Sequence, residues 1–321
     1  MKLSKLFFLA VFGFFFMTLN AQNVQSNALA TSGGLLAGTT TSGSGGNTFY
    51  GYGAGIINST GDNNTFFGHL SGDTNSTGRN NCFFGYGVAE INSNGNNDTY
   101  IGTSSAGEMV GIGNNNSFLG YYSGFLSSGS NNTFLGTETG NTAIGNGNVY
   151  IGYQAGSSLT NNDRLIIGNS TTSQLISGSF SLNQLKFNAK VGVGFGFGNY
   201  PATAGSINLA NYNLFVKGGI LTEEVRISLQ SAWADYVFAK NYNLPKLNEV
   251  EAFIAKNGHL QNVPSAKEIK ENGIELGEMA KIQQEKIEEL TLYIIEQNKI
   301  NEKQNAIIEK LEARLQKLEK K

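Results

Sequence analysis

Bulky apolar residues between positions 47 and 168 come in adjacent pairs, each followed by glycine and, except in the last copy, preceded by an Asx and a small residue. The copies begin at Asn47, Asn64, Asn81, Asp98, Asn116, Asn132, Asn148 and Arg164. Their closing glycines are 16–18 residues apart: Gly51, Gly68, Gly85, Gly102, Gly120, Gly136, Gly152 and Gly168. So regular a period predicts a stack of units, each too small to bury its own apolar face.

Each copy has the composition of a short β-strand closed by a turn, because aromatic and β-branched residues precede the glycine. Neighbouring side chains on a strand point to opposite faces, so both faces of these strands are apolar. One face can fill the interior of a coil. The other apolar face also needs to be covered, and we expect two or three copies of the chain, packed on a common axis, to cover it. We therefore expect a mainly β protein with a trimeric β-roll or solenoid over residues 47–169.

A second small residue follows four positions after the closing glycine in seven copies. These residues are Gly55, Gly72, Ala89, Ala106, Gly124, Gly140 and Gly156. Small residues at a fixed spacing suit tight corners, where the backbone needs a positive φ or approaches another segment closely. Ser, Thr, Asn and Gly fill the intervening stretches, as turns require.

The pattern changes to helical spacing near the C-terminus. Residues 245–248 lead into a helix with Val250, Phe253 and Ile254 on one side, and Asn257-Gly258 ends it. Residues 265–268 form a capping box for a second short helix that stops at Asn272-Gly273.

A long helix with a heptad repeat is expected over residues 277–321. Its a positions are Ile287, Ile294, Asn301, Ile308 and Leu315, and its d positions are Leu290, Gln297, Gln304, Leu311 and Leu318. Apolar ends with a polar middle predict a coiled coil whose polar layers fix register and oligomer number at a cost in stability.

The remaining segments are assigned by composition. Residues 1–21 combine lysines, an apolar run and a small-residue cleavage site, which is typical of a secretory signal peptide. Residues 22–46 are a Ser/Thr/Gly-rich flexible lead-in. Short β-like runs over residues 170–221 predict a β connector, and residues 222–276 form a helical neck. We expect no transmembrane span after the signal, and therefore secretion or the outer cell surface.

Charge is low and unevenly distributed. The formal net charge of −2 excludes a strong field for nucleic acids or other polyanions. Residues 22–219 hold 12 charged side chains, whereas residues 220–321 hold 32. A leucine-zipper transcription factor is excluded, because residues 267–286 hold four lysines against five glutamates and not a basic helix.

Candidate chemistry is sparse. Cys82, the single cysteine, stands where other copies carry Thr, and we expect a buried small residue. His69 is expected on a solvent-facing loop and His259 in a structural hydrogen bond. The histidines and the cysteine lack metal-site spacing, and the Gly-rich strings lack a phosphate-binding motif. We expect no metal, no cofactor and no enzymatic activity.

Two resemblances support this interpretation. The repeats resemble the trimeric head of autotransporter adhesins, and Asn148–Gly156 is close to the Asn-Thr-Phe-Ile-Gly-Tyr-Gln-Ala-Gly units of secreted bacterial tail-fibre proteins. Residues 213–321 are similar in layout to endosialidase-type intramolecular chaperones, which implies a trimerising role. Residues 222–228 lack the Ser-Asp start and the lysine of the chaperones' self-cleavage motif.

We therefore expect an exported, adhesin-like fibrous structural protein that forms a homotrimer. A glycan-binding module is the first alternative, with ligand contacts from the tyrosines that follow closing glycines: Tyr52, Tyr86, Tyr121 and Tyr153. A secreted enzyme is the second, and would need a carboxylate pair that the sequence does not reveal. Surface glycans or cell-surface proteins are the partners expected besides the chain itself.

Overall fold

The structure is a computed structural model that describes residues 24–26, 30–42, 45–91, 94–108, 113–228 and 233–320. The chain divides into two compact units after Lys190. The signal peptide predicted for residues 1–21 lies outside the described residues.

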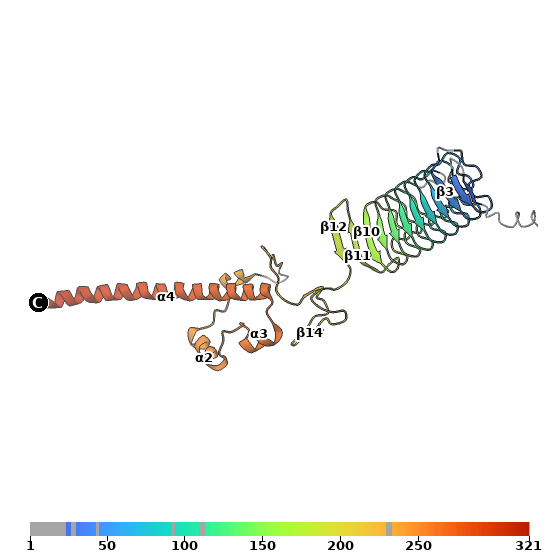
Figure 1. The fold of residues 1–321 in the computed structure, drawn as a ribbon. Coiled ribbons are helices and arrows are strands. Elements are labelled where there is room, and N and C mark those ends of the chain that lie inside the picture. The colour runs from blue at the N-terminus through green and yellow to red at the C-terminus, as the bar shows by residue number, and fades with distance from the viewer. Residues whose placement is uncertain are drawn as a thin grey trace, which may run out of the picture. The chain divides into compact units, whose positions relative to one another are not determined.

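The first unit is a parallel β-solenoid of about eight turns, which confirms the predicted fold class (Figure 1). Each repeat supplies one strand, and neighbouring strands pair in parallel with equivalent residues aligned, as Phe49 with Phe66. The strands are β3 (Asn47–Tyr50), β4 (Thr65–Phe67), β5 (Cys82–Phe84), β6 (Thr99–Ile101), β7 (Ser117–Leu119), β8 (Thr133–Leu135), β9 (Val149–Ile151) and β10 (Arg164–Gly168).

The solenoid sheet extends beyond the repeats at both ends. Strand β2 (Ala30–Gly33) pairs in parallel with β3, and β1 (Val24–Ser26) pairs antiparallel with β2. The stack therefore begins inside the segment expected to be a flexible lead-in. At the other end, β11 (Gln174–Ser179) and β12 (Gln184–Phe187) continue the sheet in antiparallel pairing.

A ladder of aromatic rings fills the interior of the solenoid. The ring two positions before each closing glycine is at most 1 % exposed: Phe49, Phe66, Phe83, Tyr100, Phe118, Phe134 and Tyr150. Centroids of successive rings are 4.5–5.2 Å apart. Buried small residues such as Ala54 and Ser71 complete each cross-section, so that one ring per coil is the core.

Two positions in the coils are restricted by close approach, and most copies have glycine at both. A Cβ on Gly68 would lie 2.0 Å from the carbonyl oxygen of Gly85 in the next coil. A Cβ on Gly72 would lie 2.6 Å from the ring of Phe66, and the φ of Gly72 is +58°. The corner position therefore requires the positive φ that its small residues predicted, and Ala89 adopts it too, at 50°.

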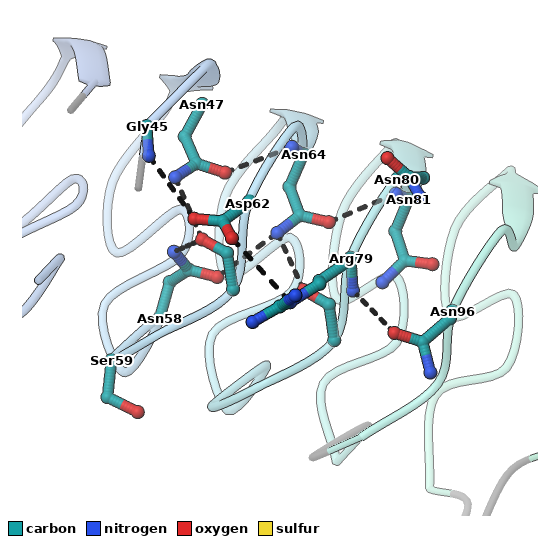
Figure 2. A network of polar contacts seen from close by, with 12 residues as sticks. Gly45, Asn47, Asn58, Ser59, Asp62, Asn64, Arg79, Asn80, Asn81 and Asn96 are labelled. Atoms are coloured by element: carbon teal, nitrogen blue, oxygen red, sulfur yellow. Dashed lines mark hydrogen bonds and ion pairs between the residues drawn. The ribbon is translucent and has the colours of Figure 1, made fainter. Parts of the chain in front are cut away.

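The Asx that opens each repeat is buried and forms a hydrogen-bonded ladder along the solenoid (Figure 2). The side-chain oxygen of Asn47 accepts from the backbone N–H of Asn64 at 2.9 Å, and that of Asn64 accepts from Asn81 at 3.0 Å. The Asn64 amide group donates to the carbonyl of Gly78 at 2.8 Å. Each Asn thus satisfies backbone groups that the turn leaves without a sheet partner.

Asp98 takes one rung of this asparagine ladder. Its Oδ1 accepts from the Asn116 N–H at 2.8 Å, but its buried Oδ2 has no hydrogen-bond partner among the described residues. A carboxylate cannot donate to a carbonyl as the Asn side chains do. Burial raises the pKa of Asp98 from 3.8 to about 7.

The second unit contains small β pairs and helices. β13 (Val191–Val193) pairs in parallel with β16 (Leu214–Val216), and β14 (Thr203–Ala204) pairs antiparallel with β15 (Ile207–Asn208). A 3₁₀ helix, η1 (Ala234–Phe238), precedes α2 (Leu247–Asn257), α3 (Ala266–Asn272) and α4 (Leu276–Glu319). α2 and α3, with their glycine ends, and α4 lie where the sequence predicted them, and the Ser265–Glu268 capping box forms. The sequence did not predict η1.

The aromatic ladder should dominate the stability of the solenoid. We predict that Phe66→Ala lowers the free energy of unfolding by about 3–5 kcal/mol, because it empties one complete cross-section. Ile57, half exposed on a corner, provides the control: Ile57→Ala should change stability by less than about 0.5 kcal/mol. Chemical denaturation of both variants measures the difference, and equal losses would contradict a core made of one ring per coil.

Asp98 should make stability depend on pH. Because its folded pKa is raised to about 7, the native state binds the proton more tightly, and stability falls as pH rises from about 4 towards 7. We predict that Asp98→Asn adds roughly 2–4 kcal/mol at about pH 8 and less than about 1 kcal/mol at about pH 4. Denaturation at both pH values tests this. Asn81→Asp should add a second fall in stability with rising pH, because a carboxylate buried at the neighbouring rung has its pKa raised in the same way.

Candidate functional surface

The outer face of the solenoid strands carries two exposed rows. One row holds the small residues Thr48, Thr65, Cys82, Thr99, Ser117 and Thr133. The other is 37–52 % exposed and bulky: Tyr50, Phe67, Phe84, Ile101, Leu119 and Leu135. Rings in the second row stack, with centroids 5.2 Å apart for Tyr50–Phe67 and 5.0 Å for Phe67–Phe84. A single chain therefore leaves a continuous apolar strip in contact with solvent.

Cys82 lies on this outer face and is exposed. The prediction that it is a buried small residue was wrong. Alternation along the strand places the Asx and the residue two after it inside, so the position between them points outwards.

A third exposed row follows the closing glycines, and we call it the tyrosine row. It consists of Tyr52, His69, Tyr86, Thr103, Tyr121, Thr137 and Tyr153. The structure brings the four candidate tyrosines onto this one row, and each is 44–55 % exposed. His69 is exposed, as predicted, and its ring stacks between those of Tyr52 and Tyr86 with both centroid distances at 5.1 Å.

The later half of the tyrosine row has polar neighbours that the sequence analysis did not single out. Glu138 and Gln154 follow Thr137 and Tyr153 directly, and the Gln154 amide donates to the Glu138 carboxylate at 2.6 Å. Both adopt positive φ, 54° and 52°, at the second position after a closing glycine. No sequence signal marked the pair, because that recurring turn position holds glycine in only two copies, Gly53 and Gly87, and Leu70, Ser104 and Tyr122 in three others.

The predicted coiled-coil residues lie on one long helix, α4. Its apolar a and d side chains are 50–69 % exposed: Ile287, Leu290, Ile294, Ile308, Leu311, Leu315 and Leu318. In the polar middle, the Gln297 amide donates to Asn301 Oδ1 at 2.9 Å within the helix, and Gln304 is exposed. Residues 294–320 are all exposed in the single chain, so this stripe is uncovered.

The first turns of α4 have an intramolecular partner. Tyr236 and Tyr242, from the segment around η1, donate to the buried carboxylates of Glu285 and Glu289. Lys286 bridges both carboxylates, at 2.9 Å from each. Burial by itself would raise the pKa of Glu285, but hydrogen bonds from Tyr236 and Lys286 outweigh it and hold that pKa below its usual value.

His259 fulfils the structural role predicted for it. Its Nδ1 lies 3.0 Å from the carbonyl oxygen of Leu260, and its ring meets the ring of Phe253 edge-on. Within the residues that the structure describes, no three His, Cys, Asp or Glu side chains gather as a metal site would.

Comparisons with protein-family models, with curated proteins and with solved structures found no match to this chain. No helix in the described part of the chain combines the length and apolar character needed to cross a membrane.

The polar middle of α4 should limit coil stability. We predict that Asn301→Ile with Gln304→Ile raises the melting temperature of the assembled helix and broadens its oligomer distribution, because polar a and d layers exchange stability for register. Circular dichroism and sedimentation of the full chain measure both. A lower melting temperature would show that these side chains lie outside the helix interface.

Proposed function

We propose that this chain is an exported, adhesin-like fibrous structural protein that assembles as a homotrimer and presents the solenoid as an extended surface. The observation that best supports this proposal is the exposed apolar strip on the outer strand face, formed by Tyr50 and its equivalents, beside a buried aromatic interior. Continuous apolar patches of this kind mark association surfaces on soluble proteins. A second and third copy of the same chain, packed on a common axis, supply matching strips.

The α4 stripe supports self-association independently. Ile287 and Leu290, the first a and d residues, line an apolar groove of about 330 Å³ with Leu247, Val250 and Leu260. The stripe continues from this groove to Leu318, so a second helix laid along it covers both. Helices in parallel would also place Arg314, at g, opposite Glu319, at the following e position of the neighbour.

The width of the apolar stripe on α4 favours three copies over two. The g positions Tyr293, Ile300 and Ile307 are apolar, and flanking positions become more enclosed as helices are added. Ile at a with Leu at d favours two strands, so these two features of α4 oppose each other. The resemblance to trimeric adhesin heads and fibre chaperones leads us to propose a trimer.

Export rests on the signal-peptide pattern of residues 1–21. The departure of residues 222–228 from the chaperone self-cleavage motif supports an assembly role for the second unit without proteolysis.

Carbohydrate binding through the tyrosine row is a second candidate function. Its support is the exposure of Tyr52, Tyr86, Tyr121 and Tyr153 along one line of the solenoid. Exposed tyrosines offer an apolar ring and a hydroxyl together, which suits contact with sugars and with protein surfaces.

Light scattering on residues 22–321 tests the assembly. We predict a mass about three times that of the chain, and dissociation on Phe84→Glu in the solenoid or Leu311→Glu in α4, because a buried unpaired carboxylate is costly. Ile57→Glu, at an exposed corner away from the strand face, is the matched control and should leave the mass unchanged.

A stable monomer at micromolar concentration would contradict the proposal. A dimer would contradict the trimer while leaving self-association in place. If Phe84→Glu and Ile57→Glu behave alike, the outer strand strip is no interface.

A further inference from the structure

The tyrosine row changes character along the solenoid. From Tyr52 to Tyr86 every coil contributes a ring, because His69 stands between the two tyrosines. From Tyr121 to Tyr153 the intervening coil contributes Thr137. The position between two tyrosines of the row is therefore occupied by a ring in one place, at His69, and not occupied by a ring in another, at Thr137.

The occupied version shows what fits between two tyrosines of this row. The imidazole of His69 lies 5.1 Å from each tyrosine ring, at interplanar angles of 20° and 15°. Tyrosines two coils apart are therefore separated by about 10 Å, twice the spacing of adjacent strands. That separation admits one further ring in contact with both.

The register at Thr137 repeats this arrangement in the backbone. Glu138 N–H donates to the carbonyl of Tyr121 at 2.8 Å, and Gln154 N–H donates to that of Thr137 at 3.0 Å. In the occupied version, Leu70 N–H donates to Tyr52 and Gly87 N–H donates to His69, at 2.8 and 2.9 Å. Thr137 is exposed, and its side chain is too short to replace the missing ring.

Polar groups adjoin the unoccupied position. Glu138 and Gln154 are half-buried and hydrogen-bonded to each other, and Thr137 contributes a hydroxyl. The carboxylate keeps acceptor capacity beyond its bond to Gln154, because each oxygen carries two lone pairs. Apolar ring contacts beside a carboxylate, an amide and a hydroxyl match a pyranose, which has apolar C–H faces and a rim of hydroxyls.

We propose that Tyr121, Thr137, Glu138, Tyr153 and Gln154 form a subsite for one neutral pyranose ring of a carbohydrate. The negative charge of Glu138 disfavours uronic and sialic acids, because like charges repel at close range. This subsite rests on the second function proposed above and specifies its ligand class. It is independent of the oligomeric state.

The chain contains a matched control position. Tyr86, Thr103 and Tyr121 repeat the Tyr–Thr–Tyr pattern one step earlier, but Ser104 and Tyr122 occupy the places of Glu138 and Gln154. The control position thus has the two flanking tyrosines without the carboxylate–amide pair, and the ring of Tyr122 packs against that of Tyr121 with centroids 4.4 Å apart.

The test uses residues 22–321 with glucose, galactose, mannose and N-acetylglucosamine as probes, and glucuronic acid as the anionic counterpart. Saturation-transfer NMR and tyrosine fluorescence titration should detect at least one neutral sugar, with a Kd of about 1 mM, and weaker binding of glucuronic acid. Thr137→His should fill the position as His69 does and weaken neutral-sugar binding at least about 10-fold, with an unchanged circular dichroism spectrum. Thr103→His should leave binding unchanged.

Each of the other possible results contradicts a specific part of the proposal. If sugars bind and Thr137→His has no effect while Tyr52→Ala abolishes binding, the row binds carbohydrate and this subsite is wrong. If no probe sugar binds the unsubstituted chain at about 50 mM, both the subsite and the carbohydrate-binding function are wrong. That result does not bear on the homotrimer, which light scattering tests. Equal losses in Thr137→His and Thr103→His would refute the role of Glu138 and Gln154; Glu138→Gln measures the carboxylate part directly.

Discussion

Stacking at one strand spacing is the constraint on which the solenoid depends. Each residue lies directly above its equivalent in the neighbouring coil, so the chain must use side chains that tolerate their own kind at about 5 Å. Aromatic rings and asparagine amides do so, because rings stack and each amide both donates and accepts. Like charges do not: Asp73 next to Glu90 has its pKa raised to about 6, by burial first and by Glu90 second. This explains why residues 22–219 hold only 12 charged side chains.

The same constraint determines which apolar surfaces a single chain buries and which it leaves exposed. Phe49 and its equivalents fill the interior, whereas Tyr50 and its equivalents, one residue later, stay about half exposed in the part of the chain that the structure describes. Along α4 the change comes near Ile294. Before it, the segment around η1 packs against the helix, with Tyr236 and Tyr242 donating to its carboxylates. From Ile294 to residue 320 every residue is exposed. Both units therefore leave apolar surface exposed, and this is the surface that the proposed assembly would cover.

Features encoded locally could be predicted from the sequence. The strand pairs, the positive-φ corners and the capping box at Ser265 depend on residues a few positions apart, and they lie where expected. Features that depend on contact between coils were missed. The burial of Asn64, the exposure of Cys82 and the pairing of Ala30 with β3 all follow from which face turns inwards and what lies one coil away. The partners Glu138 and Gln154 are 16 residues apart, one coil of the stack.

A stack of identical side chains covers its own surfaces, so specific chemistry arises where a row is interrupted. Tyr52, His69 and Tyr86 cover one another's ring faces, which limits what a ligand can reach there. In the buried asparagine ladder the interruption is Asp98, whose carboxyl has its pKa raised by burial, so that one rung is sensitive to pH. In the tyrosine row the interruptions are Thr103 and Thr137, each of which leaves two tyrosines without a ring from this row between them. The regular positions build the scaffold, and the exceptions to the repeat are where recognition can be specific.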